Sequence, residues 1–295
     1  MKLKRKILFY VMAIALISVF YTYITYEPPI YSVPQQENRA EFELVDNKSN
    51  QSSKIRLRAK SAILIDLDSG EVLAKKNEGD VRSIASLTKL ATAIVFLETD
   101  TDMFDVVTIE RDDKRGAGRS RLYTGMKVTV YDLFHIMLIS SDNVAARALA
   151  RSTGFSNDDF ALRMNELAME MNLTNTRFIE PTGLDAGNIS NACEVALLFR
   201  KALDYPMISE AISLRNFTYK ALNRERQYIA YNTNRMLYRD DVFGGKTGYI
   251  RPSGYCLALR VDDHNRHLGA LILGSTSNRN RYRDAVRLLA CVDKT

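Results

Sequence analysis

The chain has little cysteine or histidine, and this scarcity excludes several kinds of site. Only three cysteines and three histidines occur among its 295 residues. The cysteines lie far apart without a CxxC pair, and the histidines lack metal-ligand spacing, so we expect neither a bound metal nor a dithiol redox site. No motif points to a cofactor. One disulfide is possible in an oxidising compartment, and the odd count leaves at least one thiol. The cysteines are Cys193, Cys256 and Cys291.

A strongly basic domain is also absent, although the whole chain has a net charge of +6. Four of the positive charges lie within the first six residues. The other 37 Lys and Arg residues are nearly balanced by 35 Asp and Glu residues. Without a basic face the sequence does not predict nucleic-acid binding, and we expect no nucleic-acid partner.

One long hydrophobic run lies near the N-terminus. Residues 7–26 form 20 residues without a charge, enough to cross a bilayer as a helix. The basic residues 1–6 precede the run and predict a cytoplasmic N-terminus. A cleaved signal peptide is the alternative, but its apolar region would normally be shorter and would end in small residues. We therefore expect an uncleaved transmembrane anchor, followed by a flexible tether over 27–57, where prolines and polar runs cannot form a core.

The rest of the chain, 58–295, has the pattern of one α+β domain. Two β-rich runs, 61–67 and 71–74, predict a hairpin, and 255–261 with 267–274 predict another. Because strands lie at both ends and helices between them, we expect an antiparallel sheet built from both chain ends beside a helical cluster. Helical patterns cover residues 86–98, 131–138, 144–150, 160–171, 194–203 and 279–292, and a short strand pattern covers 106–109. The residues of the last helix expected inward are Ala285, Val286, Leu288 and Leu289.

A serine and a lysine stand three residues apart at the start of the first predicted helix. Ser86 and Lys89 would share one helix face, with Cβ atoms about 5–6 Å apart. A serine hydroxyl needs a base to become a nucleophile, and a desolvated lysine can be that base once its pKa falls. An isolated match of this kind more often means a serine N-cap beside a surface lysine.

Two further polar segments interrupt apolar surroundings. Ser141, Asp142 and Asn143 separate two helical patterns, where polar side chains must find partners or line a cleft, although Ser141 or Asp142 could simply cap the next helix. Lys246 to Gly248 (KTG) begin a β pattern. On a strand beside a cleft they would offer a cation and a hydroxyl to a carboxylate, and the glycine would admit a ligand closely. The plain alternative is an edge strand with a glycine turn.

Together, Ser-x-x-Lys, Ser-Asp-Asn and Lys-Thr-Gly occur in the order found in penicillin-binding proteins and class A β-lactamases. Residues 84–90 (IASLTKL) and 178–184 (FIEPTGL) resemble segments of the low-molecular-mass penicillin-binding proteins of the D-alanyl-D-alanine carboxypeptidase family. Residues 137–146, 231–234 and 254–257 are similar to the D-alanyl-D-alanine endopeptidase branch of that family, typified by penicillin-binding protein 7.

This resemblance covers residues 60–292 and implies a β-lactamase/transpeptidase-like fold with serine DD-peptidase activity. Ser86 would attack the carbonyl of a D-alanyl peptide bond to form an acyl-enzyme, and Lys89 would take its proton. Ser141 would relay a proton to the leaving amine. The substrate-binding residues would be Asn143, Lys246, Thr247, Gly248 and Tyr249, with the N–H groups of Ser86 and Tyr249 as the oxyanion hole.

The same resemblance implies a place and partners. We expect a single-pass protein of the bacterial inner membrane with its catalytic domain in the periplasm. Its substrates would be peptidoglycan stem peptides, and β-lactams would be covalent inhibitors. The 47 residues after Gly248 suffice for a hairpin and a helix, so we expect the N-terminal helix to replace the C-terminal anchor of many such carboxypeptidases.

Four functions remain open from the sequence. A DD-endopeptidase that cuts cross-links is expected first, and a DD-carboxypeptidase that removes a terminal D-alanine would use the same residues. A β-lactamase needs a carboxylate to activate the deacylating water, and Glu180 superficially offers one. A non-catalytic penicillin-binding sensor is the fourth, although every motif residue is present.

Overall fold

The computed structural model describes residues 45–46, 56–263 and 265–291. Within these ranges no helix has both the length and the apolar surface needed to cross a bilayer. The predicted anchor, 7–26, lies outside the described residues, as do the basic segment 1–6 and most of the predicted tether.

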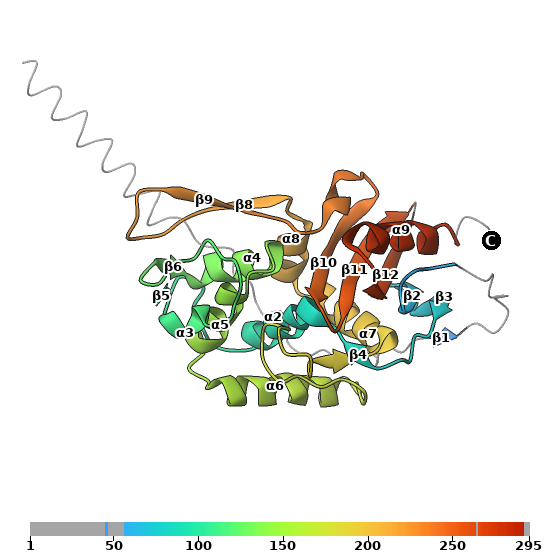
Figure 1. Cartoon of the computed structure of the whole chain (residues 1–295), viewed down its shortest axis with the longest axis horizontal. Coiled ribbons are helices and arrows are strands. Elements are labelled where there is room, and N and C mark those ends of the chain that lie inside the picture. The colour runs from blue at the N-terminus through green and yellow to red at the C-terminus, as the bar shows by residue number, and fades with distance from the viewer. Residues whose placement is uncertain (1–44, 47–55, 264, 292–295) are drawn as a thin grey trace, which may run out of the picture. The chain divides into compact units, whose positions relative to one another are not determined.

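A central sheet joins both ends of the folded chain. Its strand order is β1-β3-β2-β12-β11-β10. The five strands from β3 to β10 are antiparallel to their neighbours, and β1, inside the predicted tether, pairs in parallel with β3. Early strands thus lie beside the last ones, as Figure 1 shows for β2 and β12, so the predicted α+β sheet is confirmed. The strands are β1 (Val45–Asp46), β2 (Ser61–Asp66), β3 (Glu71–Lys76), β10 (Val242–Ile250), β11 (Gly254–Asp263) and β12 (Arg266–Ser275).

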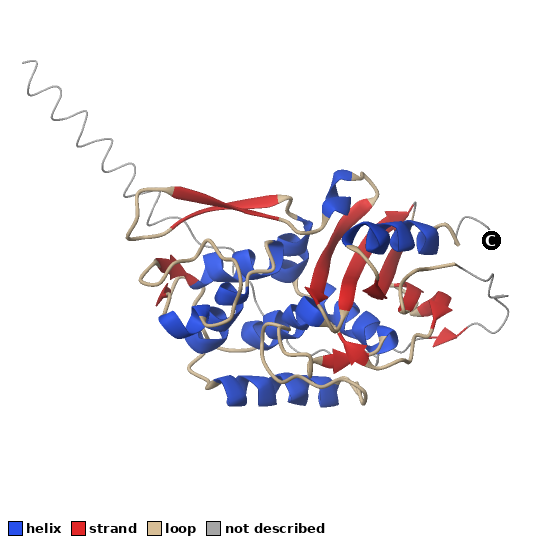
Figure 2. Ribbon diagram, in the orientation of Figure 1, coloured by secondary structure: helices blue, strands red, loops and turns tan. Residues whose placement is uncertain are grey.

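Alternate residues of these strands enter two hydrophobic cores, because successive side chains point to opposite faces of a sheet. On one face, residues such as Ile63 and Leu271 join the larger core with helices α2 and α7. On the other face, residues such as Leu64 and Ile272 pack against α9, which lies across the sheet in Figure 2. The three helices are α2 (Thr88–Leu97), α7 (Ala192–Leu203) and α9 (Asn278–Leu289).

Helix α9 buries part of the predicted set, together with two residues that were not predicted. Leu288 is buried as expected, but Val286 is 42% exposed, so its predicted inward position is wrong. Arg281 and Asp284 are buried instead, because they lie at the helical spacing that shares a face with Leu288. Asp284 is satisfied there by the hydroxyl of Ser275, which donates to it over 2.9 Å.

The helical cluster packs around α2. Nine of the ten α2 residues are buried, as expected from its broad apolar face. The other predicted helices are confirmed to within a few residues, whereas α3 (Arg111–Lys114) and α8 (Pro206–Ser213) were not predicted. The remaining elements are η1 (Ala85–Leu87), α3 (Arg111–Lys114), α4 (Val130–Ile139), α5 (Asn143–Ser152), α6 (Asn157–Glu170), α8 (Pro206–Ser213) and η2 (Arg235–Tyr238), with two small sheets, β4 (Arg82–Ser83) with β7 (Ile189–Ser190) and β5 (Val106–Thr108) with β6 (Lys127–Thr129).

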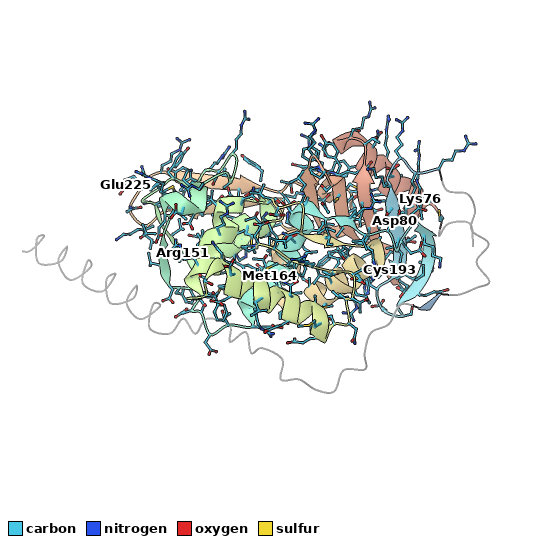
Figure 3. All side chains as sticks on the ribbon, turned by 60° about the horizontal axis from the view of Figure 1, so that its bottom comes forward. Lys76, Asp80, Arg151, Met164, Cys193 and Glu225 are labelled. Atoms are coloured by element: carbon cyan, nitrogen blue, oxygen red, sulfur yellow. The ribbon has the colours of Figure 1, made fainter. Side chains whose placement is uncertain are left out.

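A hairpin formed by β8 (Asn216–Lys220) and β9 (Gln227–Tyr231) was not predicted from the sequence. Its connection contains neither glycine nor proline, so the usual turn signal is missing. Phe217 stacks on His135 of α4, with ring centroids 4.7 Å apart, and this contact holds the hairpin against the helical cluster. Figure 3 labels Glu225, which lies in the connection between the two strands.

Candidate active site

Ser86 lies in the 3-10 turn η1, which leads directly into α2. Ala85 has a φ of 49°, a left-handed conformation that is uncommon for residues with a Cβ. Gly183 packs so close to this turn that a Cβ on it would lie 2.0 Å from the Ala85 carbonyl oxygen. Gly183 also has a φ of +82°, so its position requires glycine twice over. The turn leaves the Ser86 side chain half-buried at the head of α2.

Lys89 lies one turn further along, and its side chain is fully buried. Its Nζ is 3.1 Å from Ser86 Oγ and donates to Asn143 Oδ1 over 2.7 Å. It also donates to the carbonyl oxygen of Thr182 over 2.5 Å. The alternative of a capping serine beside a surface lysine is therefore wrong. Instead, hydrogen bonds to Asn143 and to the Thr182 carbonyl hold the lysine amine beside the serine hydroxyl.

Burial lowers the pKa of Lys89 from 10.5 to about 7. Desolvation is the largest cause, because a charged ammonium loses its hydration in the interior. Arg147 lowers the pKa further, while the carboxylates of Glu180 and Asp142 oppose both effects. A substantial fraction of Lys89 is therefore neutral near pH 7, which is the state that can accept the proton of Ser86.

The Ser-Asp-Asn segment both caps a helix and lines the site, with different residues in the two roles. Asp142 caps α5, since its carboxylate accepts from the N–H of Ala145 over 3.0 Å. Ser141 has a φ of 58°, and this left-handed turn points its hydroxyl toward Lys246, whose Nζ is 2.7 Å away. Asn143 reaches Lys89 with its carbonyl oxygen and donates its amide to the Ala117 carbonyl over 2.8 Å.

Lys246 and Thr247 lie on β10, the edge strand of the central sheet. The Lys246 side chain is 1% exposed. Its pKa is lowered well below the usual lysine value, chiefly by desolvation and then by the charges of Lys89 and Arg281. Thr247 Oγ1 donates to Thr233 Oγ1 over 2.6 Å. β10 is thus an edge strand, as the plain alternative predicted, and it also places Lys246 in the site.

Gly248 lets β10 approach Ser86 closely. A Cβ on Gly248 would lie 3.0 Å from Ser86 N and 3.1 Å from Ala85 Cβ. The next residue, Tyr249, stacks its ring on Tyr255 at a centroid distance of 4.3 Å and is 52% exposed. The close backbone approach therefore depends on the glycine, while the tyrosine ring lies at the surface.

Arg281 was not predicted as a site residue, although it is buried and supports β10. Its Nη1 donates to the carbonyl oxygens of Gly248 (3.2 Å) and Cys256 (3.3 Å). It thereby joins β10 to β11 at the level of the site. One of the four arginines of an amphipathic helix gives no sequence signal for this role, because arginine is usually exposed.

Glu180 is fully occupied in organising the loop that carries Thr182 and Gly183. Its carboxylate accepts from Thr182 N (2.8 Å) and Thr182 Oγ1 (2.5 Å). It also accepts from Gly183 N (2.6 Å), Leu184 N (2.9 Å) and Asn188 Nδ2 (3.0 Å). With these partners the carboxylate shapes the loop that directs the Thr182 carbonyl to Lys89.

The structure thus brings Ser86, Lys89, Asn143, Ser141 and Lys246 into one site from three segments of the chain: η1 with α2, the junction of α4 and α5, and β10. One lysine lies beside the Ser86 hydroxyl and the other beside the Ser141 hydroxyl. Such an arrangement can activate a serine for acyl transfer and move protons on both sides of it.

Residues 47–277 match the family model described as D-alanyl-D-alanine carboxypeptidase. The chain belongs to this family. It is therefore a hydrolase of the serine D-Ala-D-Ala peptidase class, and the prediction of the family is confirmed. Among similar proteins, a D-alanyl-D-alanine endopeptidase of Haemophilus influenzae is 34% identical over 232 residues, which cover 76% of this chain and 78% of that protein.

Relatives that are named carboxypeptidases are nearly as similar to this chain as those named endopeptidases. The D-alanyl-D-alanine carboxypeptidase DacF of Bacillus subtilis is 31% identical over 245 residues, which cover 81% of this chain and 63% of DacF. The crystal structure of the Streptomyces K15 DD-transpeptidase superimposes with a TM-score of 0.77 at 25% identity, covering 81% of this chain and 98% of that one. The transpeptidase-like fold is thereby confirmed, while the relatives divide between endopeptidase and carboxypeptidase names.

Proposed function

We propose that this chain is a DD-endopeptidase that hydrolyses D-alanyl cross-links of peptidoglycan through an acyl-enzyme on Ser86. The contact between Ser86 Oγ and the buried Lys89 amine, 3.1 Å apart, carries the catalytic part of the proposal. The likeness to the Haemophilus endopeptidase, which extends over 78% of that protein, supports the choice of branch.

In the acylation step, neutral Lys89 takes the proton of the Ser86 hydroxyl as Oγ bonds to the carbonyl carbon of D-alanine. The developing oxyanion is held by the N–H groups of Ser86 and Tyr249. β10 supports this assignment because alternate N–H groups of an edge strand point away from the sheet. Oxyanion-hole donors of this kind are worth roughly 3–4 kcal/mol each.

Collapse of the tetrahedral intermediate needs a proton on the leaving amine. Ser141 is placed to give its hydroxyl proton to that nitrogen and to regain one from Lys246, 2.7 Å away. Lys246 and Thr247 bind the carboxylate next to the leaving nitrogen, and Asn143 holds the substrate amide on the acyl side. The proton that Lys89 took from Ser86 then replaces the one that Lys246 gave up, and Lys89 returns to its neutral form. In deacylation Lys89 takes a proton from the attacking water and returns it to Ser86 Oγ as the ester breaks.

Of the other functions, a β-lactamase and a non-catalytic sensor fit less well, and a carboxypeptidase shares the site. A carboxypeptidase uses the same residues and differs only in what is attached to the leaving nitrogen. A β-lactamase would need Glu180 to activate water, and the hydrogen bonds to its carboxylate occupy it within its own loop. The non-catalytic sensor is disfavoured because the nucleophile, both lysines and their partners are assembled.

We also propose that the domain acts outside the cytoplasm, tethered to the inner membrane. The support for this location is the uncharged run 7–26 behind a basic segment and the peptidoglycan substrate itself. Separation of whole cells into membrane and soluble fractions tests it, since the full-length chain should remain with the membranes, whereas a cleaved chain would be released.

The function is tested by incubating the full-length protein with a D-Ala-linked dimeric muropeptide and, separately, with a monomeric pentapeptide. Mass spectrometry follows both reactions, and Ser86→Ala is the control. Conversion of dimer to monomers supports the endopeptidase. Loss of one D-alanine from the pentapeptide with the dimer intact would show a carboxypeptidase instead. Labelling by penicillin should occur in the wild type and be absent in Ser86→Ala, and labelling that persisted would refute the nucleophile.

A further inference from the structure

The β8–β9 hairpin connects directly to the catalytic centre. Tyr231 is the last residue of β9, and Thr233, two residues later, accepts the hydrogen bond from Thr247. The Thr233 N–H donates over 3.1 Å to the carbonyl of Ile139 at the end of α4. The end of β9 is therefore fixed between the catalytic strand and the loop that carries Ser141.

Arg121 approaches the same place from the loop before β6. Its neighbour Ser120 hydrogen-bonds the carboxylate of Asp142, next to Ser141. The Arg121 Nη1 donates to the Ile229 carbonyl over 3.0 Å, and its guanidinium carbon lies 5.9 Å from the centroid of the Tyr231 ring. Tyr231 is 57% exposed. The two side chains thus form a positioned cation–aromatic pair that remains open to solvent.

The surroundings of this pair are basic. Segments 110–127 and 215–239 contain twelve Lys and Arg residues and only four Asp and Glu residues. The segments are joined, because Leu222 N donates to the Lys127 carbonyl and Asn223 Nδ2 donates to the Gly125 carbonyl, both over 2.8 Å. A surface with this excess of positive charge favours an anionic ligand.

We propose that Arg121 and Tyr231 bind the leaving half of a cross-linked substrate, a second stem peptide with free carboxylates, and so favour cross-links over single stems. The inference rests on the proposed function, in which the leaving nitrogen faces Ser141, Lys246 and Thr247. Whatever is attached to that nitrogen extends past these residues onto the Arg121–Tyr231 pair. A guanidinium binds a carboxylate with directed hydrogen bonds, and the tyrosine ring offers a flat apolar surface to the peptide.

A single D-alanine leaving group ends at Lys246 and Thr247 and does not need the pair. The two substrates of the preceding experiment therefore report on different surfaces. Arg121→Gln and Tyr231→Ala in the full-length protein should each lower kcat/KM for the dimer about fivefold, the size expected for one exposed cationic or aromatic contact. The loss should come mainly through KM, and kcat/KM for the pentapeptide should change less than about twofold.

Two matched variants on the same surface control for charge and folding. Arg226→Gln removes an arginine near the hairpin connection, where its guanidinium lies 5.5 Å from the Tyr228 ring. Tyr238→Ala removes a tyrosine that is 73% exposed and lies under the guanidinium of Arg215. Neither should distinguish between the two substrates, and all four variants should have the wild-type thermal midpoint.

The outcomes separate the two proposals. Equal losses on dimer and pentapeptide, or undiminished dimer cleavage in both Arg121→Gln and Tyr231→Ala, would overturn the assignment of the pair while the endopeptidase stands. A wild-type protein that leaves the dimer intact would overturn the endopeptidase and the pair together. A loss confined to the dimer and to these two variants supports the pair.

Discussion

The catalytic centre and the basic surface beside it are built in opposite ways. In the centre, Lys89 and Lys246 are at most 1% exposed, and their amines touch named partners on neighbouring elements. On the surface, Arg121 and Tyr231 are exposed and touch mainly each other and the hairpin backbone. Reactivity needs a dry environment that shifts pKa values, whereas recognition of a large polymer needs access.

The difference extends to the backbone. Two glycines, Gly183 and Gly248, let the loop and the strand close around the Ser86 turn, so a small change there displaces the nucleophile. The glycines of the basic surface, such as Gly125, have open space where a Cβ would be. We therefore expect substitutions in the centre to remove activity, and substitutions on the surface to change which substrate is preferred.

The largest effect should follow removal of the buried base. Lys89→Met keeps a long apolar side chain in place and deletes the amine, so the rate of acylation by penicillin should fall by about 10³-fold or more. Stability should be unchanged or higher, because a desolvated amine is lost. Stopped-flow acylation and thermal unfolding measure the two. Lys60→Met, at an exposed lysine, is the control, and acylation within tenfold of wild type would exclude Lys89 as the base.

The second prediction compares two glycines with the same backbone angle, since Gly183 and Gly125 both have a φ of +82°. Gly125→Ala meets nothing within 4 Å and should cost only the conformational penalty, about 1 kcal/mol of unfolding free energy. Gly183→Ala also collides with the Ala85 carbonyl and should cost about 3 kcal/mol or more and slow acylation. Urea unfolding measures both, and equal costs would mean that the close approach is not constraining.

The sequence reveals the centre because its chemistry resides in side chains. Ser86, Lys89, Ser141 and Lys246 can be identified from three short motifs, and the structure brings them together. The Thr182 carbonyl cannot be identified in the same way, because any residue has one. It reaches Lys89 only through the loop that Glu180 organises, and that folding depends on many backbone hydrogen bonds.

The surface was less predictable for a different reason. β8 alternates clearly, with Phe217 and Tyr219 on one face, but it is only five residues long. β9 carries apolar residues on both faces, and the connection has neither glycine nor proline. Their place is decided by tertiary contacts such as Phe217 on His135. Similarly, Arg281 is visible as a support of β10 only when α9 and the sheet are seen together.

A smaller effect is the pH dependence of the acylation rate. It should respond to charges near Lys89 and not to charges on the basic surface. Because the pKa of Lys89 is lowered to about 7, the acylation rate should fall about tenfold per unit below that pH and level off above it. Arg147 helps to lower this pKa, so Arg147→Gln should move the bend to higher pH. Arg226→Gln, on the surface, should leave the bend in place. A bend that stays unmoved in Arg147→Gln would contradict this account of Lys89.

The smallest effect should be the salt dependence of KM for the dimeric muropeptide. The basic surface should affect substrate binding here without changing the catalytic step. Exposed charges are screened by salt, whereas the buried amines are not. Between about 50 and about 300 mM NaCl, KM for the dimeric muropeptide should rise about two- to threefold, while kcat should stay constant. In Arg121→Gln the rise should be smaller, because the screened contact is already absent. If kcat falls with KM instead, salt acts on the catalytic centre, and the separation between the two regions fails.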